Sequence, residues 1–148
     1  MNAAEQANSI DRVSKIASIV NLFKSRFPDV TADLSPWLNN PETQQFDDAH
    51  SIDLAFHFSR RHFTCQCSCI LMQVRLPASA DNPAESTATV ELSGHEILGQ
   101  QWQFSTVGKL EFRGIILPYP DAERKLREIA FKTLKLFNLK IQKSGASD

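Results

Sequence analysis

The stretch SIDLAFHFSRRHFTCQCSCILMQVRL, residues 51–76, decides the fold of this chain. Its first eight residues alternate between large apolar side chains and polar or small ones, which is the pattern of a half-buried β-strand. Arg60 and Arg61 are expected to form a turn, after which a second strand returns. If Ser59 pairs with His62, both strands turn their apolar residues to one face, as a hairpin requires. The pairs expected from this register are Phe58–Phe63, Phe56–Cys65, Leu54–Cys67 and Ile52–Cys69.

The apolar pattern changes parity after Cys69, because Ile70, Met72 and Val74 now carry the alternation. We interpret this change as a β-bulge near Cys69 or Ile70 that re-aims the strand. A polar loop, residues 77–85, follows. A third strand is expected over residues 87–93, and the residues Gly94-His95-Glu96 begin a connection that runs to Gly99.

A second hairpin is predicted from residues 101–105 and 109–117. A two-residue turn at 108–109 would place Trp102 and Phe104 on the same face as charged side chains. A three-residue loop, 106–108, instead pairs Phe104 with Leu110 and Trp102 with Phe112, and it puts Gly108 where a positive φ is needed. The second register is the one we expect.

Apolar residues spaced three and four apart predict a helix at each end of the chain. The first begins after Ser9 as N-cap, with a stripe that includes Ile10 and Val13, and Pro28 ends it. Asp121 is expected to cap the second, which frays after Leu139. The fold class is therefore α+β: a five-stranded antiparallel β-meander with N- and C-terminal amphipathic helices packed on one face. We expect residues 1–148 to form a single domain with an ordered core at about 9–139.

Composition excludes several classes of function. The chain has 148 residues and a formal net charge of −1, which is not the charge of a nucleic-acid-binding domain. It contains no apolar run of membrane-spanning length, and its first residues lack the pattern of a secretory signal. We therefore expect a cytoplasmic protein that binds neither nucleic acid nor membrane. The sequence contains no nucleophile-elbow, Walker or dinucleotide motif, so no catalytic residue is predicted.

Cys65, Cys67 and Cys69 alternate along one strand, and we expect them to be reduced thiols that pack in the core. Thiolates that share one zinc ion lie within roughly 4 Å of each other. Alternate residues of a strand are roughly 6.5–7 Å apart, so this spacing fits neither zinc nor a disulfide. By parity, His57 and His62 are expected on the opposite face from the thiols. A metal or redox role for the cysteines with histidine partners stays the second interpretation.

Two further features leave alternatives open. The ten phenylalanines either pack as core or line a pocket for a flat apolar ligand. The helix over residues 122–143 is rich in lysine and arginine, so it either faces solvent or contacts a protein partner, such as the acidic segment 29–53 of its own chain or of another copy.

The residues SIDLAFHFSRRHFTCQCSCILMQVRL and ELSGHEILGQQWQFSTV resemble those of small cyanobacterial-type proteins whose fold is similar to that of haem-utilisation and haem-degrading proteins. The resemblance spans residues 9–139 and implies haem as the cofactor to be tested. It makes His95 the first candidate for an axial ligand, with His57 and His62 next. Arg60, Arg61 and Arg113 would then pair with the propionates.

Three hypotheses follow. The first is a non-enzymatic module that binds haem or another apolar ligand. The second is a protein-interaction or assembly adaptor, possible as a homodimer, that uses the basic C-terminal helix or an exposed sheet face. The third, least favoured, is an enzyme built on His95 with Glu96 or on a cysteine. A structure that shows whether the face of the sheet away from the helices is covered, hollow or exposed would help to separate them.

Overall fold

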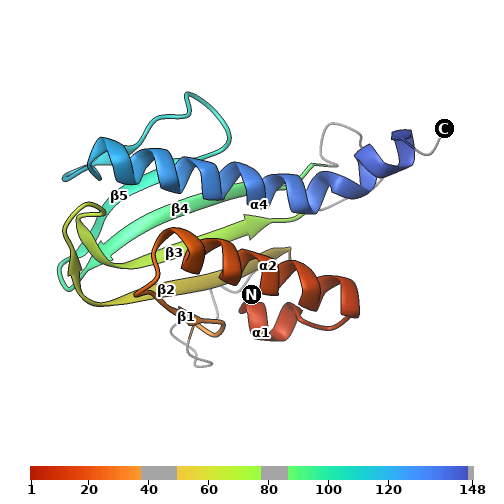
Figure 1. Ribbon diagram of the computed structural model, residues 1–148, viewed down its shortest axis with the longest axis horizontal. Coiled ribbons are helices and arrows are strands. Elements are labelled where there is room, and N and C mark those ends of the chain that lie inside the picture. Colours follow the sequence, from red (N-terminus) through yellow and green to blue (C-terminus); the bar gives the residue numbers. More distant parts are fainter. Residues whose placement is uncertain (38–49, 78–86, 147–148) are drawn as a thin grey trace.

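A computed structural model describes residues 1–37, 50–77 and 87–146, and it shows an α+β fold with one antiparallel sheet (Figure 1). The six strands lie side by side in the order of the sequence. They are β1 (Thr31–Asp33), β2 (Ser51–His62), β3 (Cys67–Arg75), β4 (Thr89–Glu96), β5 (Gly99–Ser105) and β6 (Arg113–Gly114). The helices α2 (Ile10–Arg26) and α4 (Pro120–Ala146) lie across one face of the sheet, as expected, and the short helix α1 (Ala3–Gln6) lies next to β2.

The sheet has six strands rather than the expected five. The additional strand is β1, which comes from the segment that was expected to be irregular. Its Ala32 lies opposite Phe56 of β2. A three-residue edge strand carries too little periodicity to be recognised from sequence. Ala3 is fully buried, so the packed core also starts before residue 9.

Helix α2 begins where its cap predicts, because the Ser9 side chain accepts a hydrogen bond from the backbone N–H of Arg12 (3.1 Å). Phe23 of this helix is fully buried and stacks on Phe56 of β2, with ring centroids 3.8 Å apart. The predicted stripe was wrong in its first turn, since Ile10 and Val13 are exposed. Helix α4 starts at Pro120, two residues before the start that Asp121 as N-cap predicts, so that Asp121 lies in its first turn, and it continues to Ala146 instead of fraying after Leu139.

The predicted register of the first hairpin was wrong. The observed pairs are Ile52–Val74, Leu54–Met72 and Phe56–Ile70. The strands turn later than predicted, at residues 63–66, where Gln66 has a positive φ of 58°. Four residues of β2 separate His57 from His62, whereas one residue of β3 separates their partners Cys69 and Cys67. A bulge was expected in the second strand of the hairpin. The structure instead places the extra residues in the first strand, β2.

The register of the second hairpin was also wrong, by two residues: Trp102 pairs with Gly114, and Gln103 pairs with Arg113. Gly108 does have the expected positive φ, 94°. Phe112 reaches the core from outside the strand, where its ring stacks on that of Phe104 with centroids 4.7 Å apart. The packing of Phe112 on Phe104 therefore favours the observed pairing of β5 with β6. The connection between these two strands is longer than a tight turn.

Candidate functional site

Three side chains that were considered as ligands lie in one row across the sheet. Cys69 of β3 pairs with His57 of β2 on one side and with His95 of β4 on the other. The neighbouring pair Phe56–Ile70 faces the helices, so this row faces the opposite side, because successive side chains of a strand alternate. Two expectations are thereby corrected: Cys69 does not point into the core, and His57 does not lie on the face opposite to it.

The side chains of this row are directed to other partners. His57 Nε2 lies 3.4 Å from a carboxylate oxygen of Asp33, and His95 Nε2 lies 2.8 Å from the hydroxyl of Ser93. His95 belongs to β4 rather than to a flexible connection, and burial lowers the pKa of its imidazole. In the described ranges, no three or more His, Cys, Asp or Glu side chains are placed so that they could hold a metal ion.

His62 lies on the helix side of the sheet, apart from that row. Its ring packs on Phe58 and Phe27, with centroid distances of 4.4 and 5.5 Å. Its Nδ1 accepts a hydrogen bond from the backbone N–H of Cys65 (3.2 Å), so this nitrogen is unprotonated. Burial lowers the pKa of His62, and Lys125 lowers it further while Asp29 raises it. The imidazole thus holds the β2–β3 turn in place.

Cys65 and Cys67 are fully buried, as predicted for core residues. Burial raises the pKa of the Cys65 thiol to about 12, and it raises the pKa of Cys67 further. Thiolates are the nucleophilic and metal-binding form of cysteine, so burial keeps these two side chains in the less reactive thiol form. They do not lie opposite Phe56 and Leu54 as predicted, because the register differs.

The two arginines at the end of β2 differ in their contacts. Arg61 Nε lies 3.9 Å from Glu96 Oε1, and the Arg61 guanidinium also donates a hydrogen bond to the Gln66 side chain. Glu96 Oε2 accepts a hydrogen bond from the Ser68 hydroxyl (3.1 Å). Glu96 Oε1 is enclosed and makes no hydrogen bond within the described ranges. Arg60 is exposed and makes no ion pair with any residue that the structure describes.

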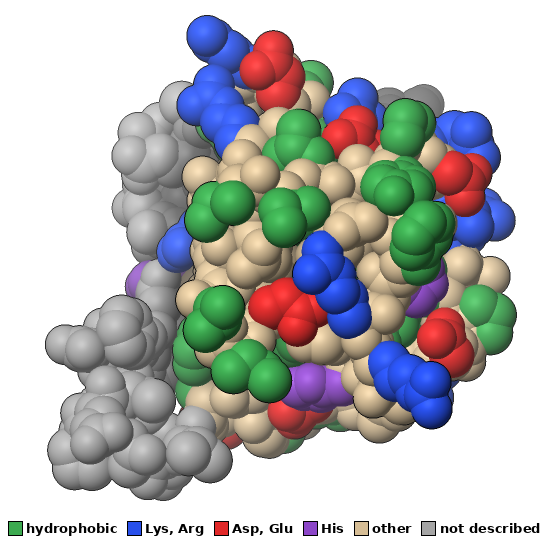
Figure 2. Space-filling model, turned by 90° about the vertical axis from the view of Figure 1, so that its left-hand side faces the viewer, with side chains coloured by type: hydrophobic (Ala, Val, Ile, Leu, Met, Phe, Trp, Pro, Cys, Tyr) green, Lys and Arg blue, Asp and Glu red, His purple; other side chains and the backbone are tan. Residues whose placement is uncertain are grey.

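An exposed apolar surface lies at the same end of the sheet as this ion pair. The turns β2–β3 and β4–β5 and the segment between β6 and α4 lie at one end of the antiparallel sheet, on the left in Figure 1. Figure 2 views this end and shows groups of hydrophobic side chains on its surface. Ile97 and Leu98, at the tip of the β4–β5 turn, are 99% and 96% exposed. We call this surface the apolar end; it consists of Phe63, Ile97, Leu98, Ile115, Leu117 and Tyr119.

Contacts between its three segments hold the apolar end together. The backbone N–H of Tyr119 donates to the carbonyl of Thr64 (2.8 Å), and the Phe63 and Tyr119 rings meet edge to face with centroids 4.9 Å apart. The backbone N–H of Ile115 donates to the carbonyl of Gln101 (2.8 Å). These contacts tie the segment between β6 and α4 to the β2–β3 turn and to β5.

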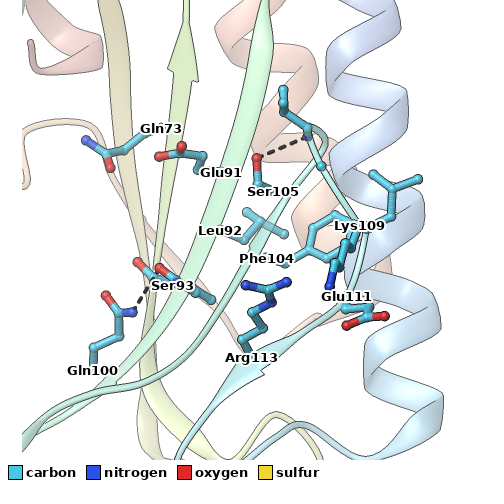
Figure 3. Close-up of a pocket in the computed structure, with 14 residues that line it drawn as sticks. Gln73, Glu91, Leu92, Ser93, Gln100, Phe104, Ser105, Lys109, Glu111 and Arg113 are labelled. Carbon is cyan, nitrogen blue, oxygen red and sulfur yellow. Dashed lines mark hydrogen bonds between the residues drawn. The ribbon is translucent and has the colours of Figure 1, made fainter.

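The face of the sheet away from the helices is covered at one side and hollowed at the other. Over β2, Asp53 is fully buried and accepts hydrogen bonds from the terminal amine of Met1 (3.0 Å) and the Trp37 indole (2.5 Å). Over β4 and β5 there is a groove of about 370 Å³, bordered by residues 107–111. Figure 3 shows Arg113 pointing into this groove among polar side chains of the strands, which include Gln73, Glu91, Ser93 and Gln100.

The predicted ligand-binding residues are thus only partly brought together. His57 and His95 share the outer face, and Arg113 lies further along it in the polar groove. Arg60 and Arg61 lie at the apolar end, and His62 is turned toward the helices. Sequence reasoning missed the apolar end altogether.

The fold and these surfaces define an α+β domain with an antiparallel sheet. A family model described as a domain of unknown function matches residues 4–139, so the chain belongs to that family. No curated protein and no solved structure was found to match the chain. Within the described ranges, none of the helices combines the length and the apolar character needed to cross a membrane.

Proposed function

We propose that this chain is a non-enzymatic protein-interaction module that docks on a partner protein through the apolar end. One observation carries the proposal: the tip of the β4–β5 turn presents Ile97 and Leu98 almost completely to solvent. Turn tips normally carry Gly, Asn, Asp or Ser, because these residues suit the turn backbone and solvent. Two large aliphatic side chains at such a tip gain nothing from the fold.

The energy available at this surface is enough for specific binding. Burying one exposed isoleucine or leucine side chain against a partner contributes about 1.5–3 kcal/mol. Ile115 and Phe63 beside the tip are 81% and 69% exposed, which extends the patch. Apolar patches larger than a few hundred Å² are uncommon on monomers and mark interaction sites.

The β2–β3 turn, which carries Phe63 of the apolar end, is also pre-organised. Trp102 is fully buried and donates a hydrogen bond from its indole Nε1 to the carbonyl of Cys65 (2.7 Å), which ties the β2–β3 turn to the middle of the sheet. His62 accepts from the Cys65 N–H in the same turn. A surface that is rigid before binding loses less conformational entropy on association, so more of the free energy of its apolar contacts contributes to affinity.

The other expected surfaces have weaker support. The cavity on the outer face is polar, whereas haem and other flat apolar ligands need a mainly apolar lining. On the basic helix, Lys125 pairs with Asp121, and Lys132 pairs with Glu128. Haem binding and docking through α4 therefore stay secondary proposals.

A binding experiment with matched variants tests the proposal. Proteins that co-purify with the wild-type chain from the cells that make it are identified, produced separately and tested for direct binding by calorimetry. The test variant combines Ile97→Ser with Leu98→Ser, and the control is Val107→Ser, an exposed apolar residue at the other end of β5. We expect the double variant to weaken direct binding by at least about tenfold. Equal affinity of wild type and double variant for every direct partner would refute the proposal.

A further inference from the structure

We infer that the groove on the outer face of the sheet is a binding site for a small hydroxycarboxylate, a molecule that carries one carboxylate and several hydroxyl groups. The groove has a volume of about 370 Å³, which suits a small molecule. It lies over β4 and β5 rather than at the apolar end, so this site is separate from the proposed docking surface and does not depend on it. Its support comes from one arginine and from the polar side chains beside it.

A row of polar side chains crosses the groove. Gln103 of β5 pairs with Ser93 of β4 on one side and with Arg113 of β6 on the other. Trp102 and Phe104, the neighbours of Gln103 along β5, are buried in the core, so the row faces outward. Side chains of paired strands lie about 5 Å apart, so the row spans roughly 10 Å, which is enough for a small molecule that reaches from Arg113 to Ser93.

Arg113 supplies a positive charge that the chain leaves unpaired. Glu91 and Glu111 line the same groove, yet the Arg113 guanidinium makes no ion pair or hydrogen bond with any residue that the structure describes. Glu91 instead pairs with Arg75, at 3.3 Å. On the border of the groove, Lys109 and Glu111 balance each other in charge. The groove therefore has one positive charge in excess, and Figure 3 shows it directed inward.

One excess charge favours a carboxylate as the anionic group of the ligand. An arginine binds a carboxylate through two parallel hydrogen bonds, so Arg113 alone can satisfy this group. A phosphate monoester carries a charge of about −1.5 to −2 and would need a second cation. His95 does not supply that cation near neutral pH, because burial lowers the pKa of its imidazole.

The other side chains of the groove favour hydroxyl groups on the ligand. Gln100 donates a hydrogen bond from Nε2 to Gln103 Oε1 (3.3 Å), so the Gln103 amide nitrogen is left as a donor and the Gln100 carbonyl oxygen as an acceptor. Gln73 of β3 adds a side-chain amide that makes no hydrogen bond within the described ranges. A hydroxyl both donates and accepts, so it can bind either group of these amides. An apolar ligand would leave the amides without partners.

Titration of the isotope-labelled protein with gluconate, followed by nuclear magnetic resonance, tests the inference. Gluconate carries one carboxylate and a chain of hydroxyls, sorbitol has the same carbon chain without the carboxylate, and inorganic phosphate tests the anion alone. We expect gluconate to shift the backbone signals of Ser93, Gln103 and Arg113 saturably, with a dissociation constant of about 1 mM. Sorbitol and phosphate should each bind at least about fivefold more weakly. All titrations are made at one ionic strength, because salt screens exposed charges.

Variants at two arginines show whether the groove is responsible. Arg113→Gln is expected to weaken gluconate binding by at least about tenfold. Arg60→Gln removes the same charge away from the groove and should bind like wild type. Arg113→Lys keeps the charge without the paired hydrogen bonds, so its affinity should lie between those of wild type and R113Q. Unchanged signals outside the groove show that each variant is folded. The inference is overturned if gluconate gives no saturable shift of these signals, if Arg113→Gln leaves its affinity unchanged, or if sorbitol or phosphate binds as tightly.

Discussion

Gly94 of β4 lies directly beneath the indole ring of Trp102 of β5. The two residues pair across the strands, and a Cβ atom added at Gly94 would lie 2.3 Å from Trp102 Cε2. The absence of a side chain at Gly94 lets the indole lie flat over the sheet, from where its Nε1 reaches the Cys65 carbonyl. This contact connects the centre of the sheet to the turn that carries Phe63. The geometry of the apolar end therefore depends on a glycine in the core.

We expect Gly94→Ala to lower the free energy of unfolding by about 1–3 kcal/mol, because the indole must move to make room for the methyl group. Urea denaturation followed by tryptophan fluorescence measures the change. The control is Gln103→Ala at the next position of β5, where the side chain is exposed and an effect within about 0.5 kcal/mol is expected. A Gly94→Ala protein as stable as wild type would show that the close approach of Trp102 is not needed.

The thiols are expected to react slowly and in a fixed order. Burial raises the pKa of all three thiols, so little thiolate is present near neutral pH. Cys69 is the one that is partly exposed, and it should react first with a disulfide reagent, whereas Cys65 and Cys67 react only as the protein unfolds. Mass spectrometry of the labelled peptides gives the order, and labelling in urea is the control. Fast labelling of Cys65 or Cys67 in the native protein would contradict their placement in the core.

Stability is expected to fall as the pH is lowered. The pKa values of His62 and His95 lie below their ordinary value of 6.5 in the folded protein, so the unfolded chain binds more protons. By linkage, the free energy of unfolding is highest above that value and decreases as the pH falls through 6.5 toward the folded pKa values. Protonation of His62 also removes the acceptor for the Cys65 N–H.

Urea unfolding at about pH 7.5 and at about pH 5.5 measures this dependence. His62→Gln and His95→Gln should each reduce the difference in the free energy of unfolding between the two pH values, and the double variant should reduce this difference most. If the free energy of unfolding of the double variant depends on pH as strongly as that of wild type, these two imidazoles do not cause the pH dependence.

The apolar tip is expected to contribute nothing to folding. The double variant Ile97→Ser with Leu98→Ser should change the free energy of unfolding of the monomer by no more than about 0.5 kcal/mol. Ile70→Ala, in the core beneath the sheet, should cost about 2–5 kcal/mol. Unfolding at low protein concentration separates folding from association. A large loss of stability in the double variant would mean that these side chains serve the fold instead of a partner.

Much of the fold was predictable from local patterns. The alternation in residues 51–58 and the stripes around Phe23 and Leu126 correctly indicate strand and helices, because apolar periodicity reports which face is buried. The strand registers were not predictable. Both hairpin predictions assumed short turns, whereas the first hairpin continues to His62 with extra residues, and the second contains a loop whose Phe112 packs on Phe104. These choices depend on contacts between residues that are distant in sequence.

The site was less predictable than the fold. Sequence parity placed all three cysteines inward and His57 away from them, because it could not show that the extra residues lie in β2. The apolar end did leave one signal: Ile97-Leu98 sits between a charged residue and Gly99, where a turn is expected. Exposed aliphatic residues in a turn are unfavourable for solubility. This conflict between the residue type and its position in a turn is a sequence signal for a functional surface.

Photo-crosslinking in the cells that make the protein tests the central claim most directly. A photoreactive amino acid is placed at Leu98 in one variant and at Val107, at the other end of β5, in a second variant. We predict a discrete protein adduct from position 98, with this chain or with another protein, and none from position 107. Adducts from position 107 alone, or none from position 98, would contradict the claim that the chain docks through its apolar end.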